Sequence, residues 1–220
     1  MTIGEHSSTV VPLDEATLER MVQAVENVRD RLRRATTALE DANIPYAVIG
    51  GNAVAAWVSS VDPGAARNTV GVDILVNRAD FDVVKSAMAT AGFHHRQVLG
   101  VNMFLDGPQG RPRDAVHVVF AGEKVRPEYS ESAPDLTAVA RHESHKMLAL
   151  QPLVVMKLTS FRRKDQVHLL DMIDVGLIDA TFAAFTHGAC PTAERITRQP
   201  GRLICATACV FACPPAITAP

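Results

Sequence analysis

Cysteine is missing from most of this 220-residue chain. Its four cysteines, Cys190, Cys205, Cys209 and Cys213, all lie near the C-terminus. A disulfide framework spreads its cysteines through the fold, so this distribution excludes a small disulfide-stabilised scaffold and favours a reduced, cytoplasmic protein. The N-terminus also lacks the basic start, apolar core and cleavage site of a secretory signal.

An excess of either charge is also missing, because 22 Lys+Arg against 24 Asp+Glu leave a net charge of -2. This excludes a globally basic surface for nucleic acid, while a local basic patch remains compatible. The uncharged run near the C-terminus, 203–220, contains two adjacent prolines. It falls short of the roughly 20 apolar residues that a membrane-spanning helix needs, so we expect no membrane partner.

Helix and strand patterns are mixed along the chain. Asp14 is typical of a helix N-cap, and apolar residues at helical spacing predict a helix through Glu40. Strands mixed with helices predict an α/β (α+β) fold, a mixed sheet flanked by helices, with a helical C-terminal portion. The other predicted elements are strands at 46–49, 72–76, within 94–105 and at 115–120, and helices at 52–59, 78–91 and 150–175.

Two glycines, Gly50 and Gly51, join the predicted strand 46–49 to the following helix. Without a Cβ, the backbone N–H groups at a helix N-terminus can approach phosphate oxygens, where the helix dipole also favours negative charge. The pair therefore suggests a phosphate-binding turn. A tight strand-to-helix turn without a ligand is the alternative interpretation.

Asp73 lies in an otherwise apolar predicted strand, where an unpaired carboxylate is costly. In phosphoryl-type transfer, carboxylates at i and i+2 of a strand share one face and hold Mg²⁺ against the triphosphate. The position two residues before Asp73 is Gly71, so this strand offers one carboxylate. We favour a metal ligand at Asp73. The alternative is a structural aspartate bonded to Arg67 or to a backbone amide.

The segments IPYAVIGGNAVAAWV and ARNTVGVDILV together resemble the nucleotidyltransferase-fold superfamily, which includes polymerase-beta-type enzymes. With DAVHVVFAGEKVRPEY and LVVMKLTSFRRKDQVHLLDMIDVGLID, the chain is more narrowly similar to bacterial abortive-infection toxins and their uncharacterised relatives. The resemblance covers about residues 40 to 180. It implies Mg²⁺ (or Mn²⁺) and transfer of a nucleoside monophosphate from a nucleoside triphosphate. It carries the glycine turn onto Gly50 and Gly51, and one catalytic carboxylate onto Asp73.

The chain departs from the pattern of that superfamily at two places. Gly71 stands where the first metal carboxylate is expected, and the third carboxylate is expected on the strand 115–120. The candidates there are His117, as base, ligand or structural histidine, and Asp114, which alternatively pairs with Arg111 or Arg113. Because both positioning and charge neutralisation depend on the metal, we expect impaired or altered activity.

Nucleotide binding is expected to involve residues beyond the glycine pair. Lys157 and Lys164 are seven residues apart on the predicted helix 150–175 and would share a basic face that reaches phosphates. A solvated face with weak ion pairs is the alternative. Asn52 and Arg67 complete the predicted nucleotide-binding set.

We therefore expect a nucleotidyltransferase-family protein with a hydroxyl acceptor on RNA, protein or a small molecule, and an antitoxin-like partner if it is a toxin. The alternative is a catalytically inactive member that binds nucleotide, RNA or a partner protein as a regulator. In the tail the helical periodicity stops and acidic residues nearly vanish, which suggests a disordered or out-of-frame segment. The expected divisions are a loose leader at 1–12, a nucleotidyltransferase-like domain at 13–145, a helical portion at 146–180 and the tail at 181–220.

Overall fold

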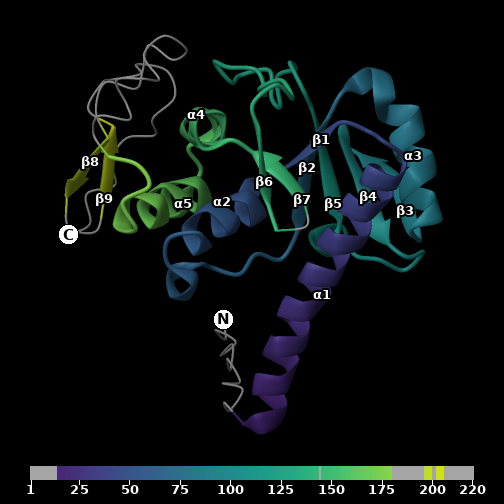
Figure 1. Ribbon diagram of the computed structural model, residues 1–220, viewed down its shortest axis with the longest axis horizontal. Helices are drawn as coiled ribbons and strands as arrows, with labels where there is room; N and C mark the ends of the chain where they lie inside the picture. The colour runs from purple at the N-terminus through teal and green to yellow at the C-terminus, as the bar shows by residue number, and fades with distance from the viewer. Residues whose placement is uncertain (1–13, 144, 180–195, 200–201, 206–220) are drawn as a thin grey trace, which may run out of the picture.

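In a computed structural model of the protein, residues 14–143, 145–179, 196–199 and 202–205 are described, and a seven-stranded sheet with surrounding helices forms the body (Figure 1). The helices are α1 (Glu15–Asp41), α2 (Gly50–Ser59), α3 (Phe81–Thr90), α4 (Leu150–Ser160) and α5 (Arg163–Asp174). The strands of this sheet are β1 (Tyr46–Ile49), β2 (Val72–Val76), β3 (Phe93–Val98), β4 (Val101–Asp106), β5 (Val116–Phe120), β6 (Val139–His142) and β7 (His145–Leu148). Short 3-10 segments span Pro63–Ala65, Arg78–Asp80 and Pro112–Asp114.

The strands lie in the order β3-β4-β5-β2-β1-β7-β6. The pairs β2–β5 and β1–β7 are parallel, and the other neighbours are antiparallel. The mixed sheet flanked by helices that the sequence predicts is thus confirmed. Every residue of β1 is buried, and in β2 the single residue that is not fully buried is Asp73. The centre of the sheet therefore has one polar interruption.

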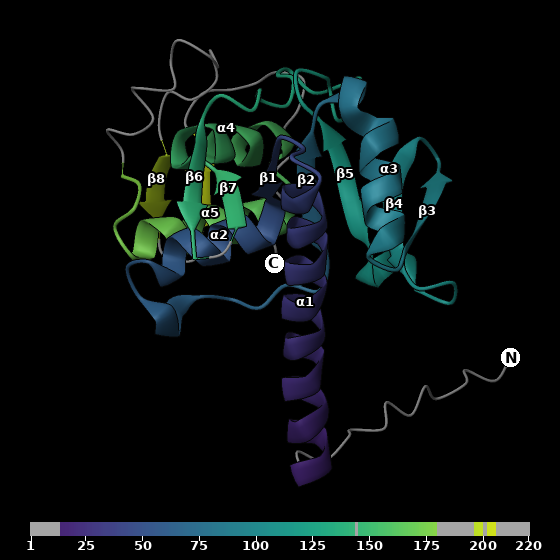
Figure 2. The same cartoon turned by 45° about the vertical axis from the view of Figure 1, so that its right-hand side comes forward.

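The helices form two groups around the sheet. α1 contacts α3, β2 and β5, whereas α2, α4 and α5 contact one another and α2 also packs on β1 and β2. Figure 2 shows α3 and the C-terminal half of α1 over one part of the sheet, with α2, α4 and α5 gathered on the side of β1 and β7. The start of α2 and the end of β1 thus meet between the central strands and the second helical group.

α1 begins as the sequence predicts, because the Asp14 carboxylate accepts a hydrogen bond from the Thr17 backbone N–H at 2.8 Å. Its C-terminal half buries Leu39 in the core, while its N-terminal half extends away from the sheet (Figure 2). Leu18 and Met21 are consequently exposed on the extending half.

The prediction of one continuous helix over 150–175 is wrong. α4 ends at Ser160, Phe161 has a left-handed backbone with φ 39°, and α5 begins at Arg163. A bulky residue rarely adopts this conformation, so surrounding contacts must hold it. They do so through Asp165, whose carboxylate accepts hydrogen bonds from the Ser160 hydroxyl and the Arg162 backbone N–H.

A hairpin that the sequence analysis did not assign lies at the edge of the sheet. β6 and β7 form it at the end of the polar stretch 122–144. The hydroxyl of Tyr46 accepts a hydrogen bond from the Lys146 backbone N–H at 3.2 Å and donates to Glu40 at 2.9 Å. Burial is the main cause that raises the pKa of Tyr46 to about 12, so this hydroxyl stays protonated at neutral pH. The tyrosine thereby ties the hairpin to β1.

Within the tail, β8 (Ile196–Gln199) and β9 (Arg202–Cys205) pair as a separate antiparallel hairpin. The predicted leader 1–12 and the other tail residues lie outside the described part of the chain. Among the residues that are described, no helix is long and apolar enough to cross a membrane.

Candidate active site

The glycine turn meets the carboxylate of Asp73. Gly50 has φ +70°, a conformation that disfavours residues with a Cβ. A Cβ at Gly50 would lie 2.1 Å from Oδ2 of Asp73, so the carboxylate rests against the backbone at the start of α2. The turn from β1 into α2 and the carboxylate of Asp73 on β2 are therefore adjacent in space and belong to one site.

Asp73 and His117 stand side by side on neighbouring strands. They are Cα partners in the parallel ladder of β2 and β5, so their side chains point to the same face of the sheet. Nδ1 of His117 lies 3.7 Å from Oδ1 of Asp73, and the side chains are 29% and 32% exposed. Neither side chain makes a hydrogen bond with any residue that the structure describes. Both groups thus remain available to a ligand.

The loop before β2 closes over the glycine turn. The Asn52 side-chain amide donates a hydrogen bond to the Gly71 carbonyl at 2.8 Å, and the Thr69 hydroxyl donates to the same carbonyl at 3.3 Å. A Cβ at Gly51 would lie 3.0 Å from Oγ1 of Thr69. Asn52, one of the predicted nucleotide-binding residues, therefore holds this loop in place with its amide nitrogen.

Lys157 belongs to a buried polar cluster that joins α4 to α5. Its side chain is 7% exposed, and its ammonium lies 3.2 Å from Oδ1 of Asp165. Asp165 is fully buried and also accepts hydrogen bonds from the Ser160 hydroxyl at 2.8 Å and the Arg162 Nε at 2.8 Å. The predicted basic face shared by Lys157 and Lys164 is wrong, because the helix breaks between them and Lys157 is buried while Lys164 is exposed.

The charges of this cluster extend to Asp73. Burial lowers the pKa of Lys157 below its usual value, opposed by the negative charges of Asp165 and, more weakly, Asp73. Burial also opposes the charged form of Arg162, yet its pKa is raised, chiefly by Asp165 with a smaller contribution from Asp73. Two cations thus lie within electrostatic range of the Asp73 carboxylate.

Two other predicted site residues are bound elsewhere. Arg67 is 65% exposed, and its Nε lies 2.9 Å from Oδ1 of Asp171 on α5, so it does not pair with Asp73. Asp114 lies in a 3-10 segment ahead of β5 and accepts a hydrogen bond from Arg111 Nε at 2.8 Å. The simpler alternative for Asp114, an ion pair at the end of the strand, is the one observed.

His168 of α5 lies next to the glycine turn, with its ring carbon Cε1 3.6 Å from the position of a Cβ at Gly51. Its Nδ1 is buried and has no hydrogen-bond partner among the described residues. Burial, aided by the positive charge of Lys157, lowers the pKa of His168 to about 4. A neutral imidazole therefore packs against the start of α2.

This low pKa predicts a stability change in acid. The unfolded chain protonates His168 near pH 6.5 and the folded protein only near pH 4, so the unfolded state binds more protons between these values. The free energy of unfolding should fall as pH drops through this window, by about 1–2 kcal/mol from His168 after allowance for solvent screening. Urea unfolding between pH 7 and pH 4 measures it.

His168→Gln should flatten that dependence, and exposed His94→Gln is the matched control. His145 supplies part of the remaining slope, because burial lowers its pKa as well. An unchanged slope in His168→Gln would show that the ring is not the titrating group.

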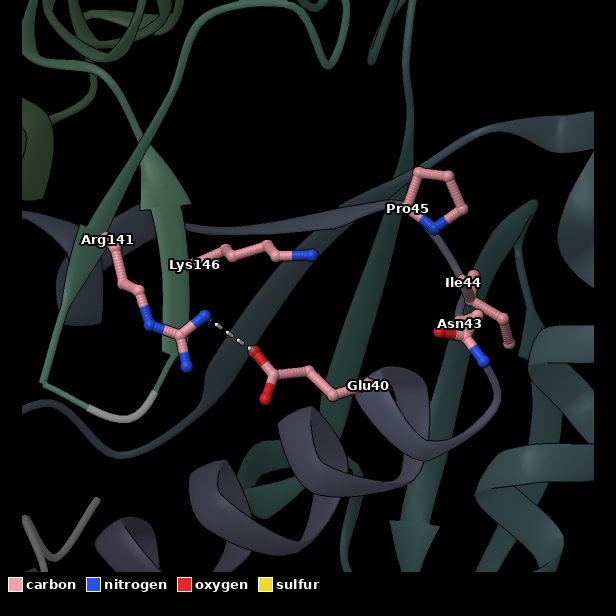
Figure 3. Close-up of a pocket in the computed structure, with 6 residues that line it drawn as sticks. All are labelled: Glu40, Asn43, Ile44, Pro45, Arg141 and Lys146. Atoms are coloured by element: carbon pink, nitrogen blue, oxygen red, sulfur yellow. Dashed lines mark ion pairs between the residues drawn. The ribbon is translucent and has the colours of Figure 1, made fainter.

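A separate pocket of about 270 Å³ lies at the opposite end of β1 from the glycine turn (Figure 3). Arg141 Nη1 and Glu40 Oε1 face each other across it at 3.8 Å. None of the residues discussed above as nucleotide or metal ligands lines it. The lining residues are Glu40, Asn43, Ile44, Pro45, Arg141 and Lys146.

The donor chemistry near Asp73 fits a divalent cation that is only partly held by protein. Asp73 supplies a carboxylate, and His117 supplies a ring nitrogen beside it. In the described part of the chain, no cluster of three or more His, Cys, Asp or Glu side chains is placed to hold a metal. A cation here would therefore need phosphate oxygens and water as further ligands, as Mg²⁺ commonly does in nucleotide sites.

No protein-family model and no curated protein matches the chain. The antibiotic-resistance factor ANT(2'')-Ia is similar in structure, with 11% identity over 75% of this chain and 94% of that chain and a TM-score of 0.49. A candidate nucleotidyltransferase from H. pylori has 12% identity over 73% of each chain and a TM-score of 0.47. An antigenic nucleotidyltransferase-like protein from Paracoccidioides brasiliensis has 18% identity over 69% of this chain and 76% of that chain, with a TM-score of 0.42.

These matches are to nucleotidyltransferases and nucleotidyltransferase-like proteins, the superfamily that the sequence resembles. None of them singles out the abortive-infection toxins. At such low identities and TM-scores they say nothing about substrate or activity.

Proposed function

We propose that this protein binds a metal–nucleoside triphosphate at Gly50 and Gly51 and transfers a nucleoside monophosphate to a hydroxyl acceptor. The observation that supports this most is the meeting of the glycine turn with the Asp73 carboxylate, 2.1 Å from the position of a Gly50 Cβ. A phosphate at the start of α2 and a cation on Asp73 would be direct neighbours. That proximity is what a metal-bound triphosphate requires.

The surrounding residues have distinct parts in this proposal. Backbone N–H groups at the start of α2 bind phosphate oxygens, favoured by the helix dipole. Lys157 and Arg162 add positive charge within range of the same place. Asp165 holds both cations in position.

Asn52 and Thr69 keep the loop that carries Gly71 against the turn. Lys164 and Arg67, which are exposed, remain candidates for contacts with the outer parts of a nucleotide or acceptor.

The transfer is a substitution at the α-phosphorus. The acceptor hydroxyl oxygen forms a bond to that phosphorus, the bond to the bridging oxygen breaks, and pyrophosphate leaves with the electron pair. The hydroxyl proton passes to water. A divalent cation, Mg²⁺ or Mn²⁺, supplies neutralisation of the triphosphate charge when bound. The acceptor is a hydroxyl on RNA, protein or a small molecule.

One observation favours a second function, a nucleotide-binding regulator without transfer activity. Gly71 has no ligand atom, and Asp114 is engaged with Arg111, so neither adds a carboxylate to Asp73. Removing one key electrostatic group typically lowers a rate by about 10²–10³-fold. Weak or altered transfer is therefore part of the first proposal, and complete loss defines the second.

Label transfer from α-³²P nucleoside triphosphates to total RNA and protein distinguishes the two functions. Wild type should label an acceptor slowly, and Asp73→Asn should lower the rate at least about 100-fold, because the carboxylate beside the glycine turn is lost. Label that appears only with Gly71→Asp would favour the regulator. Absence of label with all three proteins would contradict nucleotidyl transfer.

A separate test addresses a toxin role. Growth arrest on expression would support a toxin with an antitoxin-like partner, and harmless expression would count against it.

A further inference from the structure

Position 71, where a second metal carboxylate is expected, is a glycine, and His117 is the side chain that lies beside Asp73 instead. We propose that His117 takes the place of that carboxylate as a metal ligand. With Asp73 it forms a mixed carboxylate–imidazole site that prefers a first-row transition-metal ion such as Mn²⁺ over Mg²⁺. This inference rests on the proposed function, because the phosphates of the nucleotide complete the coordination.

The sheet itself fixes this pair. Asp73 and His117 are direct Cα partners in a parallel ladder that continues for the whole length of β2 and β5. The neighbours of Asp73 in β2, Val72 and Ile74, are fully buried. A shift in register would force these apolar side chains to the other face, so the pairing is strongly specified. The two donor atoms are thus preorganised by the core beneath them.

His117 already fills the region that a side chain at position 71 would enter. A Cβ at Gly71 would lie 3.6 Å from His117 Nδ1 and in ordinary contact with the carbonyl oxygens of Arg113 and Ala115. An acidic residue there would therefore place its carboxylate next to the imidazole nitrogen. In this chain, His117 Nδ1 is therefore the metal-donor atom at the place where a carboxylate oxygen of an acidic residue 71 would lie.

The distance between the donors suits one shared cation better than a direct bond. At 3.7 Å, His117 Nδ1 and Asp73 Oδ1 are too far apart for a hydrogen bond. Two ligand atoms that each lie about 2.1 Å from one cation are about 3.0–3.5 Å apart in octahedral or tetrahedral geometry. A movement of a few tenths of an ångström would bring both into coordination, and each side chain is partly exposed to solvent.

The donor types determine which metal is preferred. Mg²⁺ favours oxygen ligands, whereas imidazole suits transition metals, whose affinity for such sites rises along the series from Mn²⁺. Substituting a nitrogen for a carboxylate oxygen therefore shifts the preference away from Mg²⁺. Because the protein gives only two donors, the site should be strong only when triphosphate oxygens are present.

Binding of Mn²⁺ tests this inference without any turnover. It is monitored through the loss of the electron paramagnetic resonance signal of the free ion. The titrations use Mn²⁺ alone and Mn²⁺ with α,β-methylene nucleoside triphosphates, and Mg²⁺ is measured by competition. After subtraction of the Mn²⁺ that the analogue binds without protein, wild type should bind Mn²⁺ at least about tenfold more tightly with the analogue than without it, and more tightly than Mg²⁺. Binding of a fluorescent triphosphate in EDTA reports the nucleotide site separately.

Two variants of His117 and one control variant test its part as a ligand. His117→Ala should weaken Mn²⁺ binding at least about tenfold while leaving metal-free triphosphate binding unchanged. His117→Asp should reverse the preference toward Mg²⁺. His94→Ala removes an exposed imidazole from β3 and is the matched control, for which no change is expected. Thermal unfolding verifies that each variant is folded.

The outcomes are distinct for the two proposals. Unchanged Mn²⁺ binding in His117→Ala, or a preference for Mg²⁺ in wild type, would overturn the mixed site while the nucleotide site stands. Absence of triphosphate binding in wild type, both in EDTA and with Mn²⁺, would overturn the proposed function. In that case, Mn²⁺ binding that occurs without nucleotide and is lost in both His117→Ala and Asp73→Asn would still support the metal pair, and absence of Mn²⁺ binding in wild type would refute it.

Discussion

Gly50→Ala should destabilise the protein by about 2–5 kcal/mol and abolish triphosphate binding. Two effects add up at this position. The left-handed backbone, with φ +70°, disfavours any residue that has a Cβ. The new Cβ would also lie 2.1 Å from Asp73 Oδ2, so either the carboxylate or the start of α2 must move. Urea unfolding and fluorescent-triphosphate titration measure the two consequences.

The chain offers a matched control for the backbone effect. Gly92 has φ +84°, and a Cβ there would meet nothing within 4 Å. Gly92→Ala should therefore cost only the backbone strain, about 1–2 kcal/mol, and should leave binding intact. An Asp73→Ala background removes the carboxylate and keeps only the tight contact with the Cβ of residue 73, at 3.0 Å, so Gly50→Ala should cost less there than in the wild-type background. Equal destabilisation by Gly50→Ala and Gly92→Ala in the wild-type background would mean that the predicted contact with Asp73 has no energetic weight.

Asp165→Ala should cost about 3–5 kcal/mol, because it leaves the buried ammonium of Lys157 without its partner. Burial alone raises the pKa of Asp165, but hydrogen bonds from Arg162 and the charge of Lys157 hold it below its usual value. The carboxylate is thus charged at neutral pH and anchors both helices at the Phe161 break. Urea unfolding at pH 7 gives the free energy, and nucleotide binding should weaken with it.

A second substitution tests the stated cause. Lys157→Met in the Asp165→Ala background removes the unpaired charge, so this double variant should be about 1–3 kcal/mol more stable than Asp165→Ala. Ser160→Ala, which removes one hydrogen bond to the charged Asp165 carboxylate, should cost about 1.5–3 kcal/mol. A double variant no more stable than Asp165→Ala would contradict the view that the stranded ammonium is what destabilises it.

The parts of the site that could be predicted from sequence are those coded locally. A glycine pair directly after an apolar strand predicts a turn into a helix, and the turn is there. Asp73 stands out because one charged residue interrupts an apolar strand, and it is the one residue of β2 that is not fully buried. The glycine pair and the one charged residue therefore mark, in the sequence, the point where β1, α2 and β2 meet.

The parts that could not be predicted depend on contacts between distant residues. The helical pattern runs without interruption through Phe161, and only the burial of Asp165 between two helices explains the break. Arg162, Asp165 and His168 were consequently not recognised as residues of the site. A fully buried aspartate has no sequence signal apart from its basic neighbours. Thr69 was missed for a similar reason, since its contact with Gly51 arises only when the loop folds back.

The surroundings of Gly71 determine which substitutions evolution can make at this position. Its backbone is outside the left-handed region, and a Cβ there would make only ordinary contacts. Every glycine codon is one base away from an aspartate or a glutamate codon, so one point mutation can give this chain a second carboxylate at position 71. The fold therefore does not require glycine at position 71, and the carboxylate is absent for a reason other than backbone geometry. A single base change should therefore suffice to add or remove a carboxylate beside Asp73.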